Sequence, residues 1–389
     1  MRKLALDDDI LLNIEKPARY IGHEVNSVMK NKNAVDIRFA MCFPEVYEVG
    51  MSHLGIQILY DMFNKYEDVY CERVYSPWTD LDKIMREKHI PLFALESQDP
   101  VKEFDFLGIT LQYEMCYTNI LQVLELSDIP LHAEDRTWDD PVVIGGGPCS
   151  YNPEPIAVFF DMFYIGEGET VYDALFDAYK ANKKAGGSRK DFLLAAAKIP
   201  GIYVPSLYEV TYKEDGTIAS FAPTADGVPE KVQKQLIIDM EKEYRAVEAP
   251  VVPHIKATQD RVTLEIQRGC IRGCRFCQAG MIYRPTRERD VETLKESART
   301  MLKNTGHEEI SLSSLSSSDY SQLKELVNFL IEEFHGKAIN ISLPSLRIDA
   351  FALDVMSKVQ DVKKSVQEVI NAGSIEELTD CKKLVDYEF

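Results

Sequence analysis

Residues 261–277, RVTLEIQRGCIRGCRFC, combine a predicted β-strand with a loop that carries three cysteines. Cys270, Cys274 and Cys277 follow a C-x3-C-x2-C spacing. Three thiolates on one short loop can bind three irons of a [4Fe–4S] cluster and leave the fourth iron open to a further ligand. The loop therefore predicts an iron–sulfur site.

The residues around these cysteines suit a cluster. Gly269 and Gly273 let the backbone approach it closely, and Phe276 can shield one side from water. Six arginines surround the loop and can offset the negative charge of a thiolate-bound cluster: Arg268, Arg272, Arg275, Arg284, Arg287 and Arg289. The whole chain has a formal net charge of −19, which does not indicate a nucleic-acid partner.

Structural zinc is the alternative interpretation of the three cysteines. Zinc in structural sites prefers four protein ligands, and the nearest further candidates here are His254 and Cys381. Three soft ligands without a fourth favour the iron–sulfur cluster. The remaining cysteines are expected to be small buried residues in a reducing compartment: Cys42, Cys71, Cys116, Cys149 and Cys381.

Alternating strands and helices continue after the cysteine loop. Strands are predicted at 308–315 and 338–344, with helices that begin at Asp290 and near Leu323. Such β/α repeats are typical of a TIM-like barrel, which needs about 31 residues per repeat. The stretch from Arg261 to the last residue has room for about four repeats, so we expect an incomplete barrel.

The first part of the chain also alternates strands with single helices. The predicted strands are 35–44, 71–75, 91–97, 104–111, 141–148 and 160–169. This order favours right-handed crossovers and a doubly wound, Rossmann-like parallel sheet, whose ligands lie beyond the carboxyl ends of the strands. The residues expected there are Gly145, Gly146, Gly147, Gly166 and Glu167.

Three segments follow from this reading. We expect a Rossmann-like domain at 1–185, a connector with a small β-hairpin at 186–256, and a barrel-type domain at 257–389. The chain has no apolar run long enough to span a membrane and no apolar leader, which makes the cytoplasm the expected compartment.

The cysteine spacing, with an aromatic residue before the last cysteine and a strand before the first, resembles the radical SAM superfamily. The glycine run at 145–147, followed by Gly-Glu-Gly-Glu at 166–169, resembles the cobalamin-binding-type domain that precedes the barrel in one branch. The segments EIQRGCIRGCRFCQAG and PEVYEVGMSHLG are most similar to a bacterial subfamily of that branch. The resemblance covers roughly residues 10–364 and stops short of a complete radical SAM barrel, which implies C-terminal truncation.

This resemblance implies cofactors and site residues. The cluster would be joined by SAM, with its amino group near Ser313 and Ser314 and its carboxylate near Arg347. A corrinoid would lie at Gly145–Gly147, Gly166 and Glu167, but the family's Asp-x-His-x-x-Gly fingerprint is absent. Met51-Ser52-His53-Leu54-Gly55 is the nearest segment, and we expect no cobalt ligation by His53.

The implied function is reductive cleavage of SAM to a 5′-deoxyadenosyl radical that modifies a substrate, by methylation or by sulfur insertion. Such an enzyme needs a reducing partner of the flavodoxin or ferredoxin type. The alternative is an iron–sulfur protein that relays electrons without catalysis. No residue beyond the cluster ligands is assigned a catalytic role, and the sequence does not identify the substrate.

Overall fold

The computed structural model describes residues 4–243, 247–337 and 339–345. The chain forms two compact units. The first contains the described residues up to 237 together with 251–259, and the second contains 238–250 and the described residues from 260 onward. The connector expected at residues 186–256 stays a prediction. Within the described residues, no helix is long and apolar enough to cross a bilayer.

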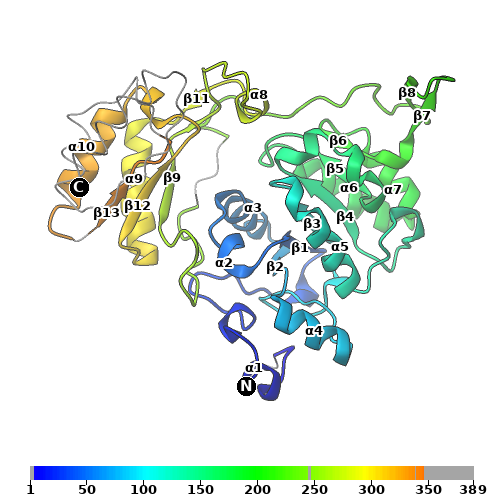
Figure 1. Ribbon diagram of the computed structural model, residues 1–389, viewed down its shortest axis with the longest axis horizontal. Helices are drawn as coiled ribbons and strands as arrows, with labels where there is room; N and C mark the ends of the chain where they lie inside the picture. The colour runs from blue at the N-terminus through cyan, green and yellow to red at the C-terminus, as the bar shows by residue number, and fades with distance from the viewer. Residues whose placement is uncertain (1–3, 244–246, 338, 346–389) are drawn as a thin grey trace. The chain divides into compact units, whose positions relative to one another are not determined.

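The first unit is built on a six-stranded sheet in the order β2-β1-β3-β4-β5-β6 (Figure 1). Strands β1 to β5 run parallel, and β6 pairs antiparallel with β5. The strand order reverses between β1 and β3, which is the switch point of a doubly wound sheet. The strands are β1 (Ile37–Phe43), β2 (Val69–Tyr75), β3 (Phe106–Thr110), β4 (Val142–Gly146), β5 (Met162–Tyr164) and β6 (Ile202–Tyr203).

Helices cover both faces of this sheet, as predicted. Strand β1 shows why, because Phe39 and Met41 pack in one apolar core while Ala40 and Cys42 pack in the other. Helices α3, α6 and α7 supply the first core, and α4 and α5 supply the second. The helices are α1 (Asp8–Leu11), α2 (Tyr47–Gly50), α3 (Leu54–Asn64), α4 (Thr79–Lys88), α5 (Tyr117–Leu126), α6 (Tyr172–Ala185) and α7 (Arg189–Ala196).

The strand predicted at 91–97 is wrong. This segment turns along the outer edge of β2, where Leu95 N–H donates to the Arg73 carbonyl at 2.9 Å. The N–H of Arg73 donates to the Glu96 carboxylate at 2.7 Å. The Glu96 carboxylate thus takes the place of a carbonyl from a further strand. The apolar run at 91–97 therefore ends the sheet at β2 and does not extend it by another strand.

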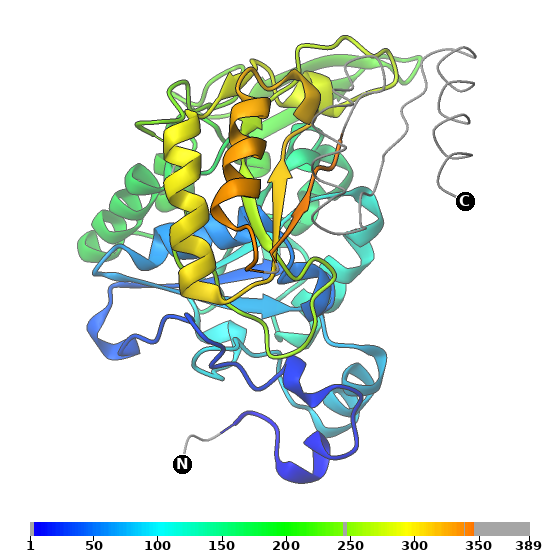
Figure 2. The same cartoon turned by 90° about the vertical axis from the view of Figure 1, so that its left-hand side faces the viewer.

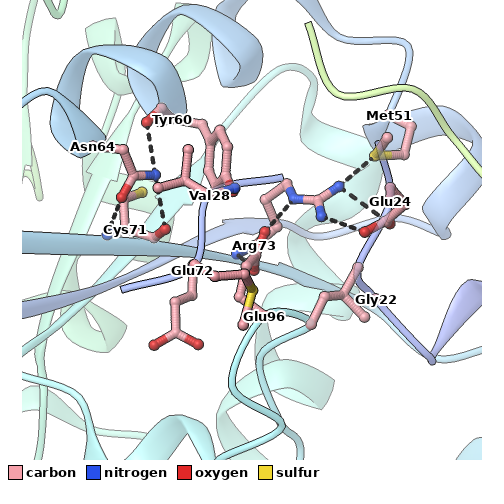
Figure 3. Close-up of polar contacts among 12 residues, drawn as sticks. Gly22, Glu24, Val28, Met51, Tyr60, Asn64, Cys71, Glu72, Arg73 and Glu96 are labelled. Carbon is pink, nitrogen blue, oxygen red and sulfur yellow. Dashed lines mark hydrogen bonds and ion pairs between the residues drawn. The ribbon is translucent and has the colours of Figure 1, made fainter. Parts of the chain in front are cut away.

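A buried ion network holds this closure together (Figure 3). The Arg73 guanidinium contacts Glu96 at 2.6 Å and Glu24 at 2.7 Å, and all three side chains are at most 2% exposed. Tyr47 also donates its hydroxyl to Glu24 at 2.9 Å. Burial by itself disfavours these charges, but the two carboxylates and the hydrogen bonds hold Arg73 protonated, and its pKa lies above its ordinary value. The network ties the segment around Glu24 to strand β2.

Strands β7 (Tyr208–Tyr212) and β8 (Ile218–Pro223) form an antiparallel hairpin around the turn at Asp215 and Gly216. The chain then returns to the sheet beyond strand β5. Gln235 pairs with Gly166 in a short parallel bridge, and the Glu167 N–H donates to the Gln235 carbonyl at 2.9 Å.

The second unit contains a three-stranded parallel sheet in the order β13-β12-β9. Helices α9 and α10 pack on one face of it and bury the apolar side chains of the strands (Figure 2). Asp290 caps α9, as predicted, by accepting the Glu292 N–H at 2.9 Å. The elements are β9 (Val262–Glu265), α9 (Val291–Thr305), β12 (Glu309–Ser313), α10 (Leu323–Glu333) and β13 (Asn340–Ser342). Strands and helices alternate along this part of the chain, and the α/β class is confirmed.

Glu241, in the second unit, contacts the start of α9. The Glu241 carboxylate accepts the Asp290 N–H at 2.8 Å and the Thr293 hydroxyl at 2.6 Å. It also lies 3.9 Å from the Arg289 guanidinium. These contacts join Glu241 to the second unit, whereas residues 251–259, just before the cysteine-bearing strand, belong to the first unit.

Candidate functional site

The cysteine loop starts at the carboxyl end of β9 and is closed at its neck by two short antiparallel strands. These are β10 (Gln267–Arg268) and β11 (Arg287–Glu288). Gly269 has a φ of +82°, and a Cβ atom there would lie 2.5 Å from the Pro285 carbonyl oxygen. Only glycine therefore fits where the two ends of the loop meet.

The three cysteines share this loop but differ in exposure. Cys274 is exposed, whereas Cys270 and Cys277 are half-buried. The Sγ of Cys270 accepts the Arg272 N–H, and the Sγ of Cys277 accepts the Gly280 N–H, each at 3.4 Å. Backbone N–H groups therefore point at two of the three sulfurs.

The donor set fits an iron–sulfur cluster better than zinc. Among the described residues, no three His, Cys, Asp or Glu side chains, the loop cysteines included, are gathered around a single ion position. His254, the first candidate for a fourth zinc ligand, hydrogen-bonds within the first unit, with Nε2 3.0 Å from the Gly22 carbonyl oxygen. Cys381 lies outside the described residues. Three thiols on one loop remain, which is the number that a cluster with an open iron needs.

Apolar side chains surround the cysteines and are exposed. Phe276 is 81% exposed, and its shielding of a bound cluster stays a prediction. Ile271 and Met281 are also more than half exposed. Gln267, at the neck of the loop, is buried, and its Oε1 has no hydrogen-bond partner within the described part of the chain. A buried acceptor without a partner is unusual and marks the neck as a place where a bound group can interact.

Three of the six arginines pair with carboxylates, and Arg289, 3.9 Å from Glu241, is the most loosely held. The Arg268 guanidinium binds both oxygens of Glu265, at 2.9 and 3.0 Å. The Arg272 guanidinium binds both oxygens of Asp319, with Nε 3.0 Å from Oδ2. Arg275 is exposed and has no side-chain partner within the described residues. That these charges offset those of a cluster stays a prediction.

Two further arginines hold the loop itself. Arg284 donates to the Arg272 carbonyl at 2.9 Å. Arg287 donates to the carbonyls of Pro285 and Tyr283, at 3.0 and 3.3 Å. Their guanidinium groups satisfy carbonyls in a loop that has little secondary structure of its own, which gives these arginines a structural role that composition does not reveal.

The loop after β12 lies beside the cysteine loop in the sheet order. Ser313 pairs with Glu265 in the β9–β12 register, and its carbonyl accepts the Ile266 N–H at 3.1 Å. The Ser314 hydroxyl lies 3.0 Å from that of Ser317 and accepts the Ser316 N–H at 3.1 Å. Ser313 and Ser314 thus stand at the carboxyl end of the neighbouring strand, where the sequence places them. Arg347 lies outside the described residues.

Sequence reasoning missed Asp319. This residue ends the short helix η9 (Ser317–Asp319) and accepts the Ser316 hydroxyl at 2.7 Å as well as the Arg272 guanidinium. Its side chain is 7% exposed. The only signal in the sequence is an acid next to a Ser-rich loop, and its partner lies 47 positions away.

The glycines predicted to line a corrinoid site have different surroundings in the first unit. A Cβ at Gly146 would meet no atom within 4 Å, whereas at Gly145 it would lie 2.7 Å from the Phe163 ring. Gly147 has a φ of +103° and lies against the Leu111 carbonyl. Gly166 and Glu167 contact the chain's own residue Gln235. Only Gly146 therefore borders open space.

His53 follows the same edge of the sheet, after strand β1. Its Nδ1 accepts the Ile56 N–H at 3.2 Å, and the ring also hydrogen-bonds with Gln112. Loss of hydration lowers the pKa of His53 to about 4, so the ring is neutral at pH 7. Both interactions hold the imidazole in the protein rather than toward a ligand.

Two family models match the chain. One, described as radical SAM proteins, N-terminal, matches residues 55–205, and the other, the radical SAM superfamily, matches residues 264–374. The first match contains strands β2 to β6, and the second contains the whole cysteine loop.

Curated relatives come from Methanocaldococcus jannaschii. An uncharacterised protein of this organism is 28% identical over 324 residues, which are 82% of this chain and 57% of the relative. A putative methylthiotransferase is 28% identical over 174 residues, 41% of this chain and 38% of the relative. The chain thus spans little more than half the length of the longer-matching relative.

Two solved structures of the radical S-adenosylmethionine methyltransferase TsrM from Kitasatospora setae are also similar. The structure with tryptophan and a SAM analogue has a TM-score of 0.46 and 13% identity, and the structure with cobalamin and a [4Fe–4S] cluster has 0.47 and 12%. These alignments cover 87% and 86% of this chain, and 60% of TsrM in each case.

Proposed function

Because the chain belongs to the radical SAM superfamily, we propose that Cys270, Cys274 and Cys277 bind its [4Fe–4S] cluster and that the protein cleaves SAM reductively. The observation that carries the proposal is a loop with three accessible thiols, closed by β10 and β11 at the end of the first barrel-type strand. When bound, the cluster supplies the electron that breaks the C5′–S bond of SAM, which gives methionine and a 5′-deoxyadenosyl radical that takes hydrogen from a substrate.

The chain's own residues prepare the site. The N–H groups of Arg272 and Gly280 donate hydrogen bonds to two of the sulfurs and help to orient them. Ser313 and Ser314, at the end of β12, offer a hydroxyl and backbone groups to the amino group of SAM, next to the strand that leads into the cysteine loop. Arg347 remains our candidate for the SAM carboxylate, since its guanidinium can bind a carboxylate through two hydrogen bonds.

The test is SAM cleavage by the anaerobically reconstituted and chemically reduced protein, with 5′-deoxyadenosine and methionine measured by mass spectrometry. We expect both products from the native chain and neither from Cys274→Ala. A protein that holds a cluster and accepts electrons but releases no 5′-deoxyadenosine would be an electron-relay protein, and the enzymatic proposal would be wrong.

For the overall reaction we propose transfer of a methyl group or insertion of sulfur into a substrate. The support is the similarity to a relative described as a putative methylthiotransferase. A flavodoxin- or ferredoxin-type donor would supply the electrons. Candidate RNA, protein and small-molecule fractions incubated with SAM labelled at its methyl group would reveal the class of the methyl or methylthio acceptor, and label found only in SAM and methionine would contradict methyl transfer.

We also propose that the first unit binds a corrinoid at the open edge beside Gly146, without His53 as a cobalt ligand. The support is the switch-point sheet, the free space over Gly146 and the engagement of both sides of the His53 ring. Hydroxocobalamin added to the full chain should shift its visible spectrum, and His53→Asn should bind equally well. No spectral change at high micromolar protein would contradict the proposal.

A further inference from the structure

The cysteine loop and the loop after β12 are joined by an ion pair. Arg272 lies between Cys270 and Cys274, and its guanidinium binds both carboxylate oxygens of Asp319. The two residues come from loops that follow neighbouring strands, β9 and β12. The pair therefore crosses directly from the predicted cluster loop to the loop predicted to bind SAM.

Both partners are fixed by further contacts. The Ser316 hydroxyl donates to Asp319 at 2.7 Å, and Ser316 is 2% exposed. On the other side, the Arg272 carbonyl accepts the Arg284 guanidinium at 2.9 Å, and the Arg272 N–H donates to the Cys270 sulfur. A single residue, Arg272, therefore contacts both Asp319 and the first cysteine.

The same two loops are joined at a second place. Glu288 accepts the N–H of Ser321 at 3.1 Å and also the Ser321 hydroxyl. The Tyr320 hydroxyl donates to the Arg289 carbonyl at 2.8 Å. The end of the cysteine loop is therefore anchored independently, so loss of the Arg272–Asp319 pair should free the cysteine-bearing part without detaching the whole loop.

An exposed ion pair of this kind contributes little, about 0–1 kcal/mol. This pair differs, because the Asp319 side chain is 7% exposed and both of its oxygens accept from the same guanidinium. Bidentate, charge-assisted hydrogen bonds are about twice as strong as neutral ones and fix orientation as well as distance. The geometry suits a positioning role.

We propose that the Arg272–Asp319 pair is a latch that couples the geometry of the cluster loop to that of the SAM loop. Asp319 and Arg272 are positioning residues, and the inference rests on the proposed cluster at Cys270, Cys274 and Cys277. With the latch closed, the loop that receives SAM is held in register with the first cluster ligand. Without the ion pair, the cluster still assembles, but the loop after β12 is no longer aligned with the cluster loop and binds SAM more weakly.

The test compares Arg272→Met and Asp319→Asn with a matched control, Arg299→Met. Arg299 forms an ion pair with Glu333 at 3.1 Å, between helices α9 and α10 of the same unit. We expect all three variants to assemble the native iron content. The two latch variants should bind SAM about tenfold more weakly, and SAM should change the electron paramagnetic resonance spectrum of the reduced cluster less than in the native protein. The control should match the native protein in both.

Two further measurements separate a latch from general loss of structure. The exchanged pair Arg272→Asp with Asp319→Arg should regain part of the SAM affinity, because it restores the attraction with reversed charges. In the metal-free protein, Cys270 should react faster with iodoacetamide in Arg272→Met than in Arg299→Met. SAM affinity, spectra and thiol reactivity equal to the control would overturn the latch. Failure of the native protein to assemble a cluster would overturn the proposed function, while the metal-free thiol rates would still decide the latch.

Discussion

His53 acts as the N-cap of helix α3, where Nδ1 accepts the Ile56 N–H. The ring lies against Phe43, with centroids 5.2 Å apart, and its pKa falls from 6.5 to about 4. Between these two values the unfolded chain binds a proton that the folded chain does not. The stability of the first unit should therefore rise with pH through this window, and the contribution should be fully present above pH 6.5.

The replacement His53→Asn tests this assignment, because asparagine keeps the capping oxygen and removes the titrating ring. Both tryptophans, Trp78 and Trp138, belong to the first unit, so their fluorescence in urea reports its unfolding. We expect the native protein to lose stability below pH 6.5 with a slope of up to about 1.4 kcal/mol per pH unit more than the variant. If the free energies of unfolding of the native protein and of the variant changed equally with pH, His53 would have the same pKa in the folded and the unfolded chain.

At the scale of elements, hydrophobic periodicity predicted most strands and helices correctly. Strand β1, with its alternate contacts to two cores, and the helix capped by Asp290 follow directly from residue pattern and local capping. The error at 91–97 has a physical cause. The Glu96 carboxylate accepts the Arg73 N–H, which in a longer sheet would bond to the backbone of another strand. The pattern of a single sequence does not reveal which charged residues pair across the fold.

The same limit applies to the candidate site. Spacing alone places three cysteines on one loop, because their contacts are local. The partners of Arg272 and Gly166 are distant in sequence, at Asp319 and Gln235, and no local rule connects them. Long-range polar contacts therefore account for what sequence reasoning missed.

The ion network at the edge of β2 should be the most sensitive polar element of the first unit. Replacement of Arg73 by methionine leaves the carboxylates of Glu24 and Glu96 buried without their cation. Breaking a buried ion pair in this way costs about 3–5 kcal/mol. We expect Arg73→Met to lower the free energy of unfolding by that amount, measured by tryptophan fluorescence in urea.

The control for this prediction is Lys65→Met. Lys65 forms an ion pair with Asp61 at 2.6 Å on the same unit, but its side chain is 57% exposed. Its loss should change stability by less than about 1 kcal/mol. If Arg73→Met were no more destabilising than Lys65→Met, the network would not be what closes the sheet edge.

At the scale of the whole molecule, the two units carry separate proposed tasks. The first unit has open space beside Gly146, at the carboxyl end of strand β4, and the second unit carries the cysteine loop. The four cysteines described in the first unit are buried: Cys42, Cys71, Cys116 and Cys149. Burial raises the pKa of the Cys42 thiol well above its ordinary value, which keeps it protonated and unsuited to metal binding. The cluster should therefore depend on the second unit alone.

Iron and acid-labile sulfide in the anaerobically reconstituted protein test this account most directly. We predict about four irons and four sulfides per chain. The content should be lost in Cys270→Ala, Cys274→Ala and Cys277→Ala, and kept in Cys42→Ala and Cys149→Ala. Stoichiometric zinc without labile sulfide, or a cluster that survives loss of any of the three loop cysteines, would contradict the central claim.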